Sequence, residues 1–248
     1  MFRRTPLRRL VWAGAMLLAC QQAMAGIVIT GTRVIYPEGQ KEVSVKLNNN
    51  GNLPALVQAW TDAGDPKASP TDAKTPFVLS PPVFRVDPSK GQTLRLMLKG
   101  GEMTAGRESV YYLNVLEIPP KAQQQSDANT LQMAFRSRIK IFYRPAGLTG
   151  KPDEAPAQLR WTLVPGKDGK GYALQASNPS RYHVSQVGLS LVAGGKRYAA
   201  EDGMVGPGET RQFAIQGLSG KPGAGAKVEF ESINDYGALN PVSSPLAF

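Results

Sequence analysis

Cysteine and histidine are almost absent from this sequence: Cys20 and His183 are the single examples in 248 residues. One cysteine cannot form an intrachain disulfide, so the fold has to rest on an apolar core. His183 has no HExxH or acidic-cluster context. The glycine-rich stretch at residues 221–225 lacks the GK[ST] of a phosphate-binding loop. We therefore expect no enzymatic activity, no catalytic residue, no metal and no cofactor.

Long apolar runs are also absent, and only a short one occurs near the start. Residues 10–19 are apolar but too few to span a bilayer as a helix. A small-x-small cleavage site, Ala-Met-Ala, follows at 23–25, and four arginines precede the run: Arg3, Arg4, Arg8 and Arg9. This pattern predicts a cleavable secretory signal peptide over residues 1–25. Cys20 lies inside it, and Leu-Leu-Ala-Cys at 17–20 leaves lipid attachment at Cys20 as an alternative.

Charge of one sign is only slightly in excess once the signal peptide is set aside. Its four arginines account for four of the ten excess positive charges, so that 25 Lys and Arg residues then face 19 Asp and Glu residues, a net charge of +6. The remaining basic residues form no cluster of the nucleic-acid-binding kind. We expect no nucleic-acid partner and no stable membrane insertion.

What the sequence does contain is a succession of short β-type runs with turn residues between them. Seven runs fall in residues 26–145: 27–36, 42–47, 54–61, 77–86, 93–98, 108–118 and 131–143. Their spacing and the lack of a helical period predict an immunoglobulin-like sandwich. Trp60 is expected in its core, and the double proline at 81–82 predicts a sheet edge or a bend. Residues 146–157 are predicted as a linker, and 158–248 as a second, smaller sandwich.

The most informative stretch is residues 131–145, LQMAFRSRIKIFYRP. Leu131, Met133 and Phe135 alternate with more polar residues, which is the period of a strand with one apolar face. Lys140 lies within the apolar continuation, where a cation costs free energy unless it meets an anion. This combination suggests a docking edge: the apolar row would pair with another chain's strand, and the cation would hold that chain's terminal carboxylate.

Several motifs in order resemble those of the periplasmic chaperones of the chaperone–usher pilus-assembly pathway. They are TRVIY at 32–36, SPPVFR at 80–85, RES at 107–109, LN at 113–114, EIPP at 117–120, IKIFYRP at 139–145, NP at 178–179 and INDYG at 233–237. The resemblance covers the mature chain. It implies an all-β protein with two immunoglobulin-like domains set in an L, and capture of pilus subunits by donor-strand complementation.

The resemblance also implies roles for particular residues. Arg33 and Lys140 match the cleft cations that anchor the subunit's C-terminal carboxylate, although each could instead pair with an internal carboxylate or extend to solvent. The donor-strand residues would be Leu131, Met133 and Phe135, whose alternative location is the protein's own core. A further set matches an interdomain ion network: Glu108, Arg144 and Asp235.

The implied partners are pilus (fimbrial) subunits and an outer-membrane usher, and the implied location is the periplasm. The polar segment at 121–130 resembles the short-loop branch of the family. Without a client, the exposed apolar strand predicts a monomer or weak self-association. The alternative is an immunoglobulin-like binding or adhesion module that uses the same strand for another partner.

Overall fold

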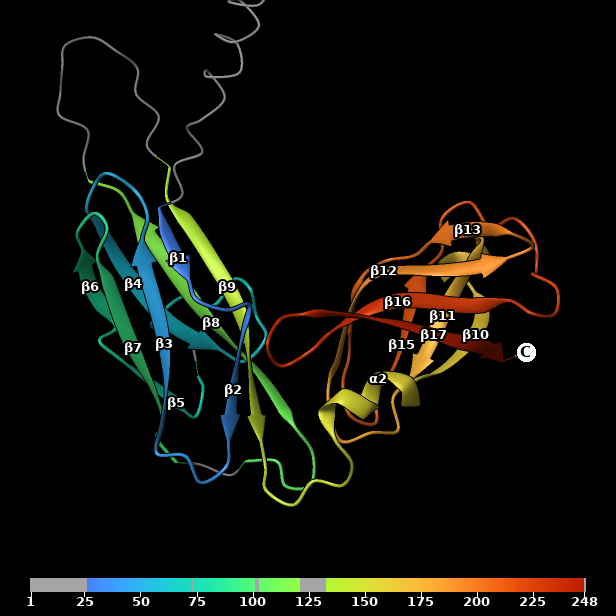
Figure 1. Ribbon diagram of the computed structural model, residues 1–248, viewed down its shortest axis with the longest axis horizontal. Coiled ribbons are helices and arrows are strands. Elements are labelled where there is room, and N and C mark those ends of the chain that lie inside the picture. The colour runs from blue at the N-terminus through green and yellow to red at the C-terminus, as the bar shows by residue number, and fades with distance from the viewer. Residues whose placement is uncertain (1–25, 73, 101–102, 121–132, 248) are drawn as a thin grey trace, which may run out of the picture.

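Two β-domains make up the computed structural model, which describes residues 26–247 except 73, 101–102 and 121–132. The predicted signal peptide, Cys20 and Leu131 lie outside the described residues. In Figure 1 the strands of the N-terminal domain run roughly vertically and those of the C-terminal domain roughly horizontally, so the domains meet at an angle. Within the described part of the chain, every helix is too short to cross a membrane.

The N-terminal domain is a sandwich of two sheets. The first has the order β1-β3-β7-β5, with bounds Ile27–Ile29, Glu42–Asn49, Gly91–Leu98 and Phe77–Ser80. The second has the order β2-β9-β8-β4-β6, with bounds Arg33–Pro37, Phe135–Arg144, Ser109–Ile118, Ala55–Asp62 and Val83–Val86. Alternate residues of both sheets fill the space between them, including the fully buried Leu47, Leu94, Leu96, Leu113 and Ile141. Each such side chain stabilises the fold by about 1.5–3 kcal/mol.

The first predicted strand, 27–36, is in fact two strands in opposite sheets. Gly31 has φ +99°, a conformation that favours glycine, and the chain crosses there from one sheet to the other. β1 therefore pairs antiparallel with β3, whereas β2 pairs parallel with β9. The crossing places Arg33 at the start of β2, beside the middle of β9.

The double proline at 81–82 also separates two strands, and the predicted interruption is confirmed. β5 and β6 lie at the outer edges of opposite sheets. Trp60 is buried as predicted, but it lies outside the apolar cluster between the two sheets. Its side chain is buried on the outer face of β4, where Nε1 donates to the Ala68 carbonyl and the Arg136 guanidinium carbon lies 4.7 Å from the ring centroid. A loop and an arginine cover this tryptophan, which periodicity alone could not indicate.

β9 begins at Phe135, later than the predicted start at Leu131. Met133 and Ala134 precede the strand and belong to no assigned element. The pairing of β9 with β8 starts at the Phe135–Glu117 pair, which is where the regular strand begins.

The C-terminal domain is built on eight strands in the order β13-β12-β16-β17-β10-β11-β15, with β14 beside β12. The bounds of β10 to β17 are Arg160–Pro165, Tyr172–Ser177, Val184–Ala193, Lys196–Ala199, Gly203–Val205, Thr210–Ala214, Lys227–Ile233 and Leu239–Ala247. Trp161 packs against Phe213 and Phe230, with ring centroids 6.2 and 5.6 Å away, at the centre of a second core.

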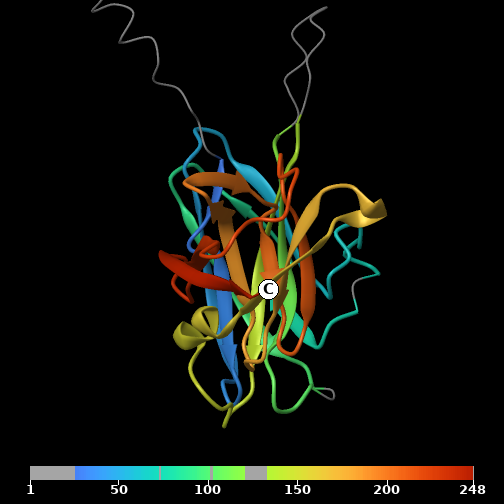
Figure 2. The same cartoon turned by 90° about the vertical axis from the view of Figure 1, so that its right-hand side faces the viewer.

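The segment predicted as a linker contains helical turns. These are the 3-10 helix η1 (Pro152–Glu154), which begins with a proline, and the short helix α2 (Ala155–Gln158). A further 3-10 helix, η2 (Lys167–Gly169), lies outside this segment, between β10 and β11. Ala155 is fully buried and belongs to the second core. Both Figure 1 and the side view of Figure 2 show α2 at the margin of the C-terminal domain.

Candidate functional site in the interdomain cleft

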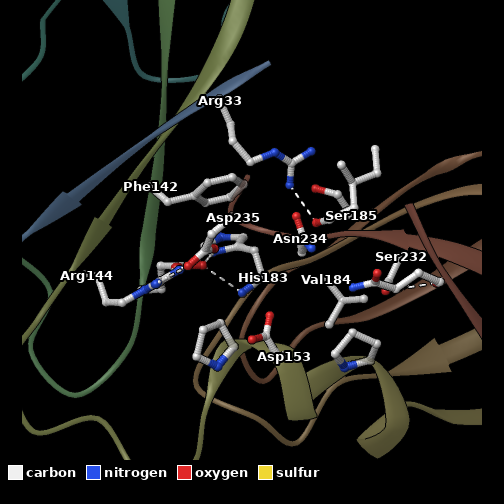
Figure 3. A pocket seen from close by; sticks show the side chains of 15 residues that line it. Arg33, Phe142, Arg144, Asp153, His183, Val184, Ser185, Ser232, Asn234 and Asp235 are labelled. Atoms are coloured by element: carbon white, nitrogen blue, oxygen red, sulfur yellow. Dashed lines mark hydrogen bonds and ion pairs between the residues drawn. The ribbon is translucent and has the colours of Figure 1, made fainter. Parts of the chain in front are cut away.

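Two cations from neighbouring strands face the C-terminal domain at the angle between the domains. Arg33 on β2 is the register partner of Lys140 on β9. The Arg33 Nη1 donates to the Ile233 carbonyl oxygen at 2.8 Å (Figure 3), and the Lys140 Nζ donates to the Ser185 Oγ at 3.2 Å. Both partners belong to the C-terminal domain, so the cations lie in a cleft that the two domains build together.

Neither cation is neutralised within the described residues. No described carboxylate lies within 4.0 Å of Arg33 or Lys140, and the buried Nε of Arg33 has no hydrogen-bond partner. Burial, and next the charges of Arg33 and Arg211, lower the pKa of Lys140 to about 8. Burial also lowers the pKa of Arg33, although Asp235 and Glu108 partly oppose this. Two desolvated cations side by side form a site that favours an anion.

The remaining arginine of the cleft, Arg144, is fully paired. Its Nη2 lies 2.8 Å from the Glu108 Oε1, and its Nη1 lies 2.6 Å from the Asp235 Oδ2 on the C-terminal domain. These two carboxylates raise the pKa of Arg144 although burial acts in the opposite direction. The structure therefore brings together Glu108, Arg144 and Asp235, the three residues that the sequence suggested as an interdomain network.

His183 joins this network, which sequence reasoning did not anticipate. Its backbone N–H donates to the Glu108 Oε2 at 2.8 Å, and its ring Nδ1 lies 2.9 Å from the same oxygen. The Glu108 side chain is 2% exposed, so its charge is compensated almost entirely by protein groups. In Figure 3, Arg144, Asp235 and His183 converge below the Phe142 ring, and Arg33 lies above it.

The turn that carries Asp235 is fitted closely against the N-terminal domain. Gly237 has φ +84°, and a Cβ atom built there would lie 2.6 Å from the Thr32 Oγ1. A larger residue would push the turn away from β2. The INDYG motif thus brings Asp235 within reach of Arg144.

The predicted donor row is exposed where the structure describes it. The Met133 and Phe135 residues are 55% and 59% exposed, whereas Ile141 and Tyr143, which share their parity further along β9, are buried in the core. The alternative that this row packs into the protein's own core does not hold for Met133 and Phe135. Leu131 lies outside the described residues.

Two arginines on the other face of β9, Arg136 and Arg138, were missed. The Arg138 Nε donates to the Oδ2 of the buried Asp62 at 2.9 Å, and the Arg136 Nη2 donates to the Asn114 Oδ1 at 2.6 Å. Burial would raise the pKa of Asp62, but hydrogen bonds from Arg138 and Asn114 outweigh it and hold that pKa below its usual value. The signal in the sequence was the spacing of Arg136 and Arg138, which are two residues apart and alternate with Phe135 and Ile139 along the strand.

Within the described residues, no group of three or more His, Cys, Asp or Glu side chains could hold a metal ion. The described residues thus form two sandwich domains with a cleft between them, in which Arg33 and Lys140 have no carboxylate partner, and an exposed apolar stretch at the start of β9.

Comparisons with known proteins identify the class. Residues 26–149 match the family described as pili and flagellar-assembly chaperone, PapD N-terminal domain, and residues 154–244 match pili assembly chaperone PapD, C-terminal domain. The chain is 47% identical over 218 residues to the probable fimbrial chaperone YadV of Escherichia coli, covering 87% of each. It is 40% identical over 240 residues to the chaperone protein FimB/FhaD of Bordetella pertussis, covering 94% of each.

Solved structures agree with these relatives. The YadV chaperone crystal structure superposes with a TM-score of 0.77 at 43% identity, covering 90% of this chain and 100% of that one. The SafB chaperone, in complex with the Salmonella enterica SafA pilin, gives 0.73 at 25% identity, covering 91% and 98%. The chain belongs to the PapD family of pilus-assembly chaperones. The adhesion-module alternative is not favoured, because these relatives are chaperones.

Proposed function

We propose that this protein captures pilus subunits in the periplasm by lending them the open edge of β9. The observation that carries the proposal is the pairing of Arg33 with Lys140, two cations without a described carboxylate, at the point where the open edge ends. The family membership and the chaperone–pilin complex of SafB with SafA support it.

The charges set the direction of the bound strand. The terminal carboxylate of a subunit would accept charge-assisted hydrogen bonds from Arg33 and Lys140. Its last strand would then run toward the cleft along residues 135–139, parallel to β9. β2 already runs parallel to β9 from Arg33 onward, so the guest strand would end where β2 begins.

The apolar row would supply the side chains that complete the subunit. Leu131, Met133 and Phe135 would fill a groove in which the subunit lacks a strand, and backbone ladder bonds would add affinity. Burying each side chain fully contributes about 1.5–3 kcal/mol before ordering costs. Covering this groove would also prevent subunits from aggregating.

The ion network has a separate proposed role. Arg144, held by Glu108 on one domain and Asp235 on the other, would fix the angle between the domains and so keep Ser185 and Ile233 at the cleft. We further propose that the loaded chaperone delivers its subunit to an outer-membrane usher. There the next subunit's N-terminal extension would replace β9, driven by tighter packing in the product.

The test is co-purification. The tagged full chain is expressed with the pilus subunits encoded near it, and wild type is compared with Arg33→Ala/Lys140→Ala. We expect a stoichiometric subunit with the wild type only. If no subunit accompanies either protein although the subunits are produced, the chaperone proposal fails; if both retain it equally, the anchor fails.

A further inference from the structure

The open half of β9 is held by a strand on one side only. β8 pairs with residues from Phe135 to Tyr143, whereas β2 begins its pairing at Lys140. Within the described residues, 135–139 therefore have an unpaired edge, which is the edge that a guest strand needs. A strand paired on one side is prone to local opening, and opening would have to be reversed at a free-energy cost when a guest binds.

Arg138 ties this half-paired segment to the interior of the sheet. Its guanidinium makes a two-point contact with Asp62 at the end of β4, and its carbon lies 3.5 Å from the centroid of the Tyr112 ring on β8. The side chain of Asp62 is 1% exposed, and it also accepts from Asn114 at 2.7 Å. The contact thus spans β9, β8 and β4. Bidentate arginine–carboxylate contacts fix orientation as well as distance.

Arg136 makes a second attachment one pleat closer to the open end. Its Nε lies 3.0 Å from the Asn114 Oδ1, and its Nη1 lies 2.8 Å from the Pro66 carbonyl oxygen. It also covers the Trp60 ring, which anchors the same loop through the Ala68 carbonyl. Both arginines alternate with Phe135, so they hold the strand from the face opposite the apolar row and leave its edge free.

We propose that Arg136 and Arg138 are positioning residues that keep the open half of β9 in strand conformation before a subunit arrives. They act through Asn114 and Asp62 and touch no part of the guest. This inference rests on the proposed function, because preorganisation matters only if β9 receives a strand. The two arginines would lower the free-energy cost of ordering β9 when a subunit is captured.

The test combines hydrogen exchange of the free full-length chain with capture of the subunit that co-purifies with the wild type. Arg138→Gln alone would leave Asp62 as an unpaired buried carboxylate, so the decisive variant is Asp62→Asn/Arg138→Gln, which removes both charges. In this variant we expect amide protection at residues 135–139 to fall about tenfold while 140–144 change little. Subunit affinity should fall about tenfold, with the melting temperature near that of wild type.

Arg95→Gln is the matched control, because it breaks an ion pair with Glu42 on the other sheet of the same domain. It should change neither local protection nor capture. Wild-type capture by Asp62→Asn/Arg138→Gln would show that the arginine only neutralises Asp62, and would overturn the inference. Loss of protection throughout the domain would overturn it too. Because exchange is measured without a subunit, a failure of the proposed function would be recognised separately, by the absence of co-purification.

Discussion

Arg33 and Lys140 are register partners in the parallel strands β2 and β9, and both point into the cleft without a described carboxylate beside them. Like charges on neighbouring strands are destabilising. The other cations of β9 with ion pairs, Arg138 and Arg144, are each matched by carboxylates of the chain. Within the described residues, the protein therefore neutralises Arg138 and Arg144 on either side of Lys140 and leaves Lys140 and Arg33 without a carboxylate.

Subunit affinity should fall as pH rises above about 8. The pKa of Lys140 is lowered to about 8 in the free protein, and a bound carboxylate would raise it. Below pH 8 the lysine is charged in both states, so affinity stays constant; above it, binding requires proton uptake and weakens by up to about tenfold per pH unit. Titration calorimetry at several pH values measures this. Lys140→Arg should abolish the slope, since arginine stays charged.

Lys140→Met should abolish capture without lowering the stability of the protein. The folded-state pKa of Lys140 lies below its unfolded value, so the charged lysine costs the fold free energy at neutral pH, and stability rises between about pH 8 and 10.5, where the folded state has lost a proton that the unfolded state still binds. The substitution should remove this rise in denaturation curves. A strongly destabilised Lys140→Met protein would indicate that the lysine has an internal structural role instead.

Arg144→Gln should destabilise the folded chain by about 3–5 kcal/mol, because it leaves Glu108 buried without its cation. Urea denaturation measures the loss, and small-angle scattering should show a wider distribution of interdomain angles. Arg85→Gln is the control. It breaks an exposed pair with Asp87 and should change stability by less than about 0.5 kcal/mol. Equal effects of the two substitutions would contradict a hinge role for the network.

Phe135→Glu should weaken subunit capture and leave the melting temperature almost unchanged, because Phe135 is exposed at the open end of β9. Val83→Glu is a suitable control, since Val83 is also exposed and lies on β6 at the opposite edge of the same sheet. It should retain capture. An unfolded Phe135→Glu protein would instead mean that this side chain supports the core.

Much of the N-terminal domain could be predicted from the sequence. Strands such as β3 and β7 alternate cleanly because one face is buried and the other is not, and turn residues mark their ends. The start of β9 was predicted too early, since the alternation includes Met133 whereas, within the described residues, β8 pairs with β9 only from Phe135 onward. Periodicity records which side chains favour one face; it does not record how far a neighbouring strand extends.

By itself, the sequence determined most strands of the N-terminal domain, the alternating apolar row and the cations Arg33, Lys140 and Arg144, because these depend on local patterns and ordered motifs. Only the tertiary structure decided which cations are neutralised. Arg138 meets Asp62 across 76 residues, and Arg33 meets the Ile233 carbonyl across 200. The net charge that remains in the cleft is the outcome of such long-range pairings, and no local pattern encodes them.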